Sequence, residues 1–311
     1  MNEKDSVPAA ATYRETLEFA VVWAMVHLLG MLPRSAARAV GAGIGRLAYV
    51  GLGRLRRVGT RNLALAFPEK SEEERDAILR TEYRNLGYLL AEFCLMSSYK
   101  SEQASRFIRY DGLENYLRAR EKGKGVLVLT GHLGAWELSS FYHSLMSYPM
   151  GMVIRRLDNP LVDQFVNDIR CLHGNRVIHK DDFARGLIAS MRAGETVGIL
   201  MDTNMTPPQG VFVPFFGVEA CTASGMARVA AKTGAAVVPG FLLWEESEQK
   251  YVLRFGQELH VVATGDAEND ALTNTAAFTS VIESYIRQYP DQWLWMHRRW
   301  KTRPAGEKGI Y

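Results

Sequence analysis

The pattern of apolar positions predicts alternating strands and helices from about residue 125 onward. Residues 126–129 are apolar at every position, which is typical of a strand covered by helices on both faces. We expect further strands at 152–154, 176–178, 196–201, 236–244 and 251–257, and helices at 160–172, 183–191, 222–234 and 270–288. This alternation predicts an α/β fold, in which a mixed sheet is covered by helices on both faces.

The part of the chain before this region has a helical pattern. Residues 19–32 are apolar apart from His27, but the run is shorter than the roughly 20 residues that cross a bilayer. A second patch, 36–55, is interrupted by Arg38 and Arg46, so it is amphipathic. An apolar helix followed by basic residues is typical of a protein anchored to a membrane or lying on it. A buried helical hairpin in a soluble domain has the same pattern.

We therefore divide the chain into two regions. Residues 1–60 form the predicted N-terminal helical region, a membrane anchor or an interfacial segment, and residues 61–311 form the predicted α/β domain. The second region opens with a helical lead-in, where Ser71 and Glu74 have the spacing of a capping box at the start of a helix.

Charge and cysteine content exclude several classes of protein. The formal net charge of the 311 residues is only +3, which gives no argument for nucleic acid binding. The three cysteines are far apart, so they predict neither a disulfide scaffold nor a zinc site. Two basic clusters suit phosphates or an anionic membrane surface, although a solvated helix face has the same composition. They are Arg54, Arg56, Arg57 and Arg61, and then Arg298, Arg299, Lys301 and Arg303.

The strongest candidate for chemistry follows the apolar run 126–129. His132 lies between Gly131 and Gly134, as in a sharp turn, and Glu137 comes five positions later. If His132 precedes the next helix and Glu137 lies in its first turns, the carboxylate reaches back to the imidazole. That arrangement is a base with its orienting carboxylate, at the strand end where open α/β sheets bind ligands. A structural histidine with no chemical role is the alternative.

Other polar residues also follow predicted strands. Arg155 ends one strand, Arg170 falls late in the next helix, and Asp202 ends a further strand. These residues converge if the strand ends share one edge of the sheet, although each arginine also fits a surface ion pair and Asp202 a turn. The sequence contains no G-x-S-x-G elbow, H-E-x-x-H helix, Walker loop or dinucleotide-binding turn, and we predict no metal site.

These residues resemble a known family. His132 and Glu137 match the H-x4-[D/E] motif of the glycerolipid acyltransferases, and the flanking sequence is similar to the bacterial lipid A biosynthesis acyltransferases, the lauroyl and myristoyl transferases. Phosphatidylinositol mannoside acyltransferases share the pattern. The similar stretches are 62–69, 131–137, 155–160, 170–174, 202–217, 222–241 and 290–304.

The resemblance implies a glycerol-phosphate-acyltransferase-like fold and an enzyme of the inner membrane, with an N-terminal anchor and its catalytic domain on the cytoplasmic face. It implies transfer of a fatty acyl chain from acyl carrier protein or coenzyme A to a hydroxyl of a lipid A precursor or related glycolipid, without a cofactor. An acyl-CoA-dependent phospholipid or mannoside acyltransferase, a thioesterase and a non-catalytic membrane lipid-binding protein are the alternatives.

The resemblance also implies roles for individual residues. His132 corresponds to the base and Glu137 to its acidic partner, and the positions of Arg170 and Asp202 are implicated as well. Arg155 is mapped to the family's Tyr-Arg-Pro, where this chain has Ile-Arg-Arg. An alcohol that attacks a thioester must lose its proton, and a neutral imidazole suits that task near pH 7. Backbone N–H groups of the turn or Arg170 are candidate donors to the oxyanion. The apolar segment 211–216 either lines an acyl channel or belongs to the core.

Overall fold

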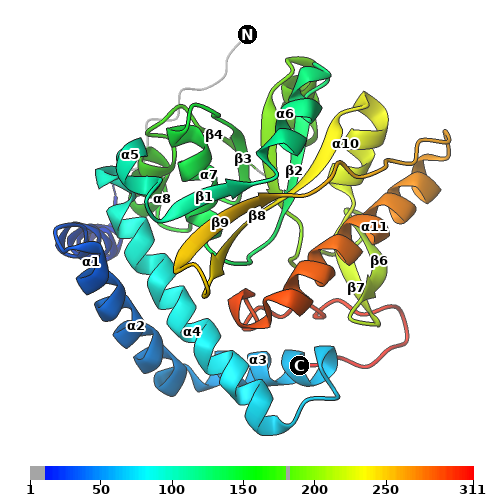
Figure 1. Ribbon diagram of the computed structural model, residues 1–311. Helices are drawn as coiled ribbons and strands as arrows, with labels where there is room; N and C mark the ends of the chain where they lie inside the picture. Colours follow the sequence, from blue (N-terminus) through cyan, green and yellow to red (C-terminus); the bar gives the residue numbers. More distant parts are fainter. Residues whose placement is uncertain (1–10, 180–182) are drawn as a thin grey trace.

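A seven-stranded sheet forms the centre of the protein (Figure 1). The computed structural model describes residues 11–179 and 183–311. The strand order is β1-β9-β8-β2-β5-β3-β4; β9 is antiparallel to β8, and all other neighbours are parallel, so the sheet is mixed, as predicted. The strands are β1 Ile108–Asp111, β2 Val126–Thr130, β3 Gly151–Ile154, β4 Arg176–His179, β5 Thr196–Leu200, β8 Ala236–Glu245 and β9 Lys250–Phe255.

Helices cover both faces of this sheet, and β2 shows why its sequence is apolar throughout. Val126 and Val128 pack on one side with residues of α6 and α7, which we call the α7 face. Leu127 and Leu129 pack on the other side with residues of α9, α10 and α11, which we call the α10 face. The helices are α6 Leu113–Glu121, α7 Trp136–Leu145, α8 Pro160–Arg170, α9 Phe183–Arg192, α10 Gly225–Thr233 and α11 Ala267–Gln288.

A two-stranded hairpin lies outside the main sheet. It pairs β6 (Gly210–Phe215) with β7 (Val218–Ala223). Pro214 lies on β6, away from the central sheet, as the sequence predicts, and Phe215 is buried in the core. The predicted helix start at residue 222 or 223 is wrong, because residues 218–223 pair with β6 and the helix begins only at Gly225.

The described chain before β1 is helical. Its elements are α1 Tyr13–Gly30, α2 Arg34–Gly51, α3 Gly53–Ala66, α4 Glu72–Leu95, η1 Met96–Ser98 and α5 Ser101–Ala104. The predicted capping box of Ser71 and Glu74 opens α4. The backbones of α2 and α4 touch, since a Cβ on Gly41 would lie 2.1 Å from the carbonyl oxygen of Gly87. Arg34 and Arg38 of α2 form ion pairs with the buried Glu92 of α4.

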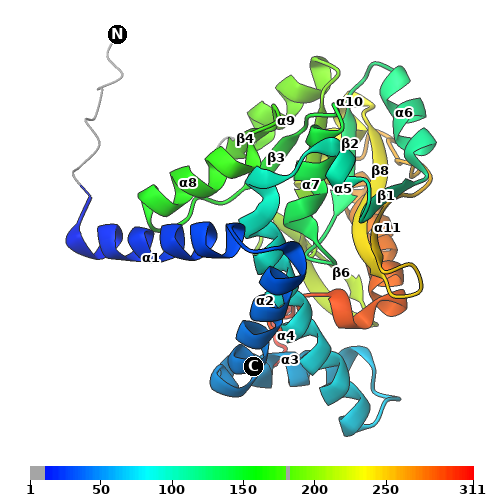
Figure 2. The ribbon, with the colours of Figure 1, turned by 60° about the vertical axis from the view of Figure 1, so that its left-hand side comes forward.

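The predicted N-terminal membrane anchor is not supported as a membrane-spanning helix. Over residues 11–179 and 183–311, no helix has the combined length and hydropathy needed to cross a bilayer. The start of α1 carries the charged residues Arg14, Glu15 and Glu18. The helix runs alongside α8 (Figure 2), where the ring of Phe19 contacts the ring of Phe165. Instead, α1 and α2 expose large apolar side chains, which we call the apolar stripe. It comprises Tyr13, Leu17, Val21 and Leu28 of α1, Met31 directly after α1, and Val40, Ile44, Leu47 and Val50 of α2.

The second predicted basic cluster is not a uniform surface patch. Arg299 is fully buried, where its guanidinium donates to the carbonyl oxygen of Cys221 and lies over the ring of Phe215. The cluster lies in a C-terminal segment that follows η3 (Pro290–Gln292). Its three tryptophans, Trp293, Trp295 and Trp300, are also buried, and the hydroxyl of Thr222 gives the inward-facing Arg299 a second buried hydrogen-bond partner.

Candidate active site

Two neighbouring parallel strands place His132 and Asp202 side by side. In the register of β2 and β5, Thr130 pairs with Leu200, so His132 and Asp202 each lie two residues beyond the paired ends. The turn after β2 passes close to β8, because a Cβ on Gly134 would lie 2.0 Å from the carbonyl oxygen of Leu242. Gly134 also has a φ of +66°, which favours glycine. This glycine therefore allows the turn that holds His132.

Asp202 is the hydrogen-bond partner of the imidazole. Its Oδ1 lies 2.9 Å from Nδ1 of His132, and its Oδ2 accepts from the backbone N–H of His132 at 2.8 Å. The indole Nε1–H of Trp293 donates to the same Oδ2 at 2.8 Å. Three donors therefore hold the carboxylate of Asp202, a residue that is only 3% exposed. Asp202 in turn fixes the imidazole ring of His132 and leaves the Nε2 atom of that ring for a substrate.

The charges of the pair stabilise one another. Burial by itself lowers the pKa of His132, but the Asp202 carboxylate, its hydrogen bond and the charge of Glu137 raise that pKa above its usual 6.5. Burial raises the pKa of Asp202, but the charge of His132 and the hydrogen bonds from His132 and Trp293 lower it below its usual value. Asp202 is therefore ionised near neutral pH, and Nδ1 of His132 carries the proton that it donates to Asp202.

The prediction of a hydrogen bond from His132 to Glu137 is wrong. Glu137 lies in the first turn of α7 and accepts two hydrogen bonds from Arg170 at the end of α8, at 2.8 Å from Nε and 2.5 Å from an Nη. Asp202 already occupies Nδ1 of His132. The carboxylate nearest in sequence thus binds an arginine, while the imidazole is held by a residue from the neighbouring strand.

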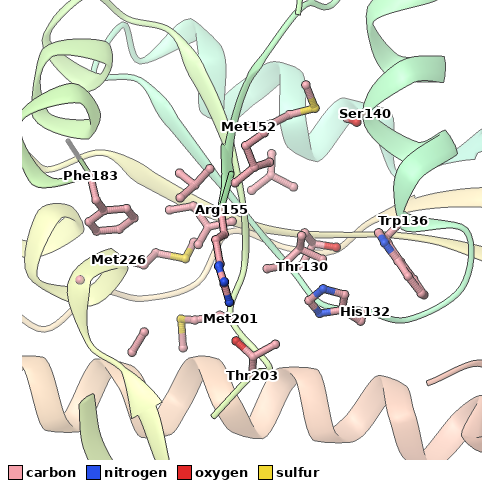
Figure 3. A pocket seen from close by; sticks show the side chains of 18 of the residues that line it. Thr130, His132, Trp136, Ser140, Met152, Arg155, Phe183, Met201, Thr203 and Met226 are labelled. Carbon is pink, nitrogen blue, oxygen red and sulfur yellow. The ribbon is translucent and has the colours of Figure 1, made fainter. Parts of the chain in front are cut away.

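A large cavity opens beside His132. It has a volume of about 1040 Å³, at the upper end of the usual size for a small-molecule site. Strands β3 and β5 pair only at Gly151–Val197 and Met152–Gly198, and their ends beyond these pairs line the cavity. The lining includes Val128 on the α7 face and Met226 on the α10 face, so the cavity has an arm on each face of the sheet. Figure 3 shows His132 and Trp136 on one side, Phe183 and Met226 on the other, and Arg155 between them.

The other predicted site residues lie at this cavity in different ways. Glu137 and Arg170 line it, and Arg170 is mostly buried. Arg155 also lines it, but its side chain is 79% exposed and pairs with the exposed Asp158. Among the described residues, no group of three His, Cys, Asp or Glu side chains is placed to hold a metal ion. The segment 211–216 does not contribute to the lining that the structure describes, and Phe215 belongs to the core.

Two residues of the site were missed in the sequence. Trp293 anchors Asp202, and His297 lines the cavity and accepts a hydrogen bond from the backbone N–H of Asn204 at 3.0 Å. Burial lowers the pKa of His297, so this ring is neutral near pH 7. Both residues follow α11 in a segment without strand or helix periodicity, so its basic residues and its similarity to the family did not indicate which side chains reach the site.

A histidine held by a buried carboxylate, beside a large cavity with many apolar lining residues, is typical of an enzyme that acts on a hydrophobic substrate. The sheet, whose parallel strands end at this cavity, places the protein among the α/β enzymes.

The chain belongs to the bacterial lipid A biosynthesis acyltransferase family, whose sequence model matches residues 7–302. It is 30% identical to the lipid A biosynthesis lauroyltransferase of Escherichia coli K12 over 95% of this chain and 94% of the relative. It is 29% identical to the palmitoleoyltransferase of the same organism, over 94% and 92%, and 25% identical to the myristoyltransferase, over 79% and 75%. The predicted family and enzyme class, an acyltransferase of lipid A biosynthesis, are therefore confirmed.

Proposed function

We propose that this protein transfers a fatty acyl chain from an acyl thioester, of acyl carrier protein or coenzyme A, to a hydroxyl of a lipid A precursor. The observation that carries the proposal is the His132–Asp202 pair, whose imidazole lines a large cavity with an arm on each face of the sheet. An acyltransferase must hold two lipid-like substrates at one base, and one cavity with two arms beside His132 suits this requirement. The names of the relatives support lipid A as the pathway of the acceptor.

In the proposed reaction, Nε2 of His132 removes the proton of the acceptor hydroxyl while its oxygen attacks the thioester carbonyl. Asp202 stabilises the imidazolium that forms. The tetrahedral intermediate then collapses, the C–S bond breaks, and the imidazolium returns its proton to the thiolate. Base catalysis of this kind contributes about 10²–10⁴-fold. The thioester is already activated, so the reaction needs neither a covalent enzyme intermediate nor a cofactor.

We assign Arg170 and Arg155 to the anionic groups of the substrates. The two hydrogen bonds to Glu137 hold the guanidinium of Arg170 in one orientation at the cavity wall, so Glu137 acts as a positioning residue. Arg155 is exposed at the cavity rim, where it suits a phosphate of the acceptor or of the donor's pantetheine arm. The backbone N–H groups of His132, Gly134 and Ala135 already donate within the protein, which favours Arg170 as the donor to the oxyanion.

We further propose that the enzyme works on the cytoplasmic surface of the inner membrane, with the apolar stripe of α1 and α2 lying in the lipid interface. The stripe joins α3, whose arginines at 54, 57 and 61 are exposed. Apolar side chains beside basic ones are typical of a helix that lies on an anionic bilayer.

Purified protein given a lipid A precursor and acyl thioesters of both donor types tests the proposal. Mass spectrometry should show an acylated precursor with the wild-type protein and about 10²–10⁴-fold less with His132→Ala. Free fatty acid as the main product would identify a thioesterase. An acylated phospholipid or mannoside would identify a different acceptor. Full activity of a folded His132→Ala protein would refute the catalytic assignment.

A further inference from the structure

The arm of the cavity on the α7 face descends along the strands in layers. Thr130 and Leu200 form the layer next to His132, and Val128 and Gly198 form the layer below, which lies about 7 Å deeper because a strand rises about 3.3 Å per residue. Both layers line the cavity. The third layer, Val126 and Thr196, contributes no residue to the lining. The arm therefore ends at the layer of Gly198.

Side chains from the covering helices close the arm below this layer. The hydroxyls of Tyr116 and Thr196 form a hydrogen bond of 2.9 Å, and both residues are buried. His143 stacks on Tyr148 at the same end, and burial lowers its pKa to about 3, so its ring is uncharged. The end of the arm thus carries no charge, as the terminal methyl group of a hydrocarbon chain requires.

The two arms differ in polarity. On the α7 face, the deeper lining consists mainly of Val128, Met150, Met152, Leu253 and Phe255. On the α10 face, the lining combines apolar residues such as Ile199 and Met226 with the charged Arg228 and Lys232. The charged lining residues of the α7 face, Glu137 and Arg170, are paired with one another, and its other polar lining residues, including Ser140 and His143, are uncharged. A hydrocarbon chain is more stable on the apolar lining, whereas the arm on the α10 face suits a polar part of a substrate.

Gly198 is unusual among the glycines of the described strands. A Cβ on it would lie 3.3 Å from Sδ of Met150 and within 4 Å of no other described atom beyond its chain neighbours. A Cβ on Gly151, Gly210 or Gly240 would instead lie within 2.6–3.1 Å of a packed side chain. Gly198 is in the middle of a central strand, yet it is partly exposed because the cavity lies over it. A glycine in a strand often marks a place where a ligand approaches the backbone.

We infer that Gly198 determines the length of acyl chain that the enzyme accepts, because the end of the chain lies over its backbone. The inference rests on the proposed acyl transfer. Any side chain at position 198 occupies the deepest part of the arm, so it excludes the last carbons of a long chain and leaves the site at His132 unchanged. The relatives named above carry names with different acyl chains, so relatedness alone does not give the length.

The test compares Gly198→Ala and Gly198→Ile with the wild type. The substrates are octanoyl, lauroyl, myristoyl and palmitoyl thioesters of acyl carrier protein, with a lipid A precursor as acceptor. We expect kcat/KM for the longest chain that the wild type uses to fall about tenfold or more relative to octanoyl, with the larger effect for isoleucine. Gly151→Ala is the matched control, because its methyl group would point to Ile178 on the α10 face.

An equal change at all chain lengths in both Gly198 variants would overturn the inference and leave acyl transfer standing. Calorimetric titration with the same series of acyl-CoA molecules gives a readout that does not depend on transfer. The variants should lose affinity for the long chains only. If the wild type binds the chains but transfers none, the proposed function fails, while the binding series still decides the role of Gly198. If the Gly198 variants bind and transfer acyl chains with the same dependence on chain length as the wild type, the acyl chain lies in the other arm and the inference is wrong.

Discussion

The Nδ1 atom of His132 lies 2.9 Å from Oδ1 of Asp202, although the two residues are 70 positions apart in the chain. Their contact depends on the parallel pairing of β2 with β5, which brings the two strand ends to one edge of the sheet. Most of the proposed chemistry depends on this contact, because it sets the orientation, tautomer and basicity of the imidazole.

Replacing Asp202 with Asn should lower kcat by about 10²–10⁴-fold, since the amide neither stabilises the imidazolium nor fixes the tautomer. The measurement is acyl transfer under saturating substrates, with circular dichroism to verify folding. Wild-type turnover in this variant would show that Asp202 only supports the turn.

The rate should depend on the protonation of His132. The base must be neutral, and its pKa is raised above 6.5 by Asp202, so kcat/KM should increase with pH through an apparent pKa above 6.5. In Asp202→Asn the raising charge is absent and burial remains, so the midpoint of the residual activity should move down. A midpoint that stays in place or moves up would contradict the pairing. A pH–rate profile of both proteins gives the comparison.

Glu137 and Arg170 should behave as one unit. Glu137→Gln and Arg170→Gln should each lower kcat/KM, because the guanidinium loses either its orientation or its charge. The double variant should cost about as much as the more harmful single one, since interacting residues are not additive. Strictly additive losses in this double-mutant cycle would mean that the two side chains act independently. Arg155→Gln serves as a comparison, because it should raise KM and leave kcat nearly unchanged.

The N-terminal helices should be held in place by Glu92. Its carboxylate binds Arg34 and Arg38 in the interior, so Glu92→Gln should lower the free energy of unfolding by about 3 kcal/mol. The pair of Arg109 and Glu248 is about 40% exposed, and Arg109→Ala should cost less than about 1 kcal/mol. Urea denaturation of the two variants measures both values, and similar losses would show that the buried network adds little.

The apolar stripe should govern membrane binding. Leu47 and Val50 are 74% and 71% exposed, so replacing both with Glu should leave stability nearly unchanged and reduce flotation with vesicles of anionic phospholipid. Leu272→Glu, at a partly exposed position on α11, is the matched control and should not affect flotation. Equal flotation of all three proteins would mean that another surface binds the lipid.

Local sequence was sufficient for the elements whose signals are local. The apolar run 126–129 and the spacing of Ser71 and Glu74 correctly predicted β2 and the start of α4. The position of His132 just after a strand, in a turn that needs glycine, also followed from neighbouring residues. The short strand β1 and the hairpin strand β7 were missed, because their pairing partners lie elsewhere in the chain.

The sequence by itself determined the fold class, the place of His132 in a turn after a strand, and the family, because apolar periodicity, turn glycines and a contiguous motif are properties of neighbouring residues. Only the tertiary structure decided which carboxylate holds the imidazole. Spacing along the chain favours Glu137, but strand pairing places Asp202 at the ring and turns Glu137 toward Arg170. The tertiary structure also placed Gly198 under an open cavity. The pairing of β5 with β2 and β3 decides what lies over this residue, which has no side chain of its own.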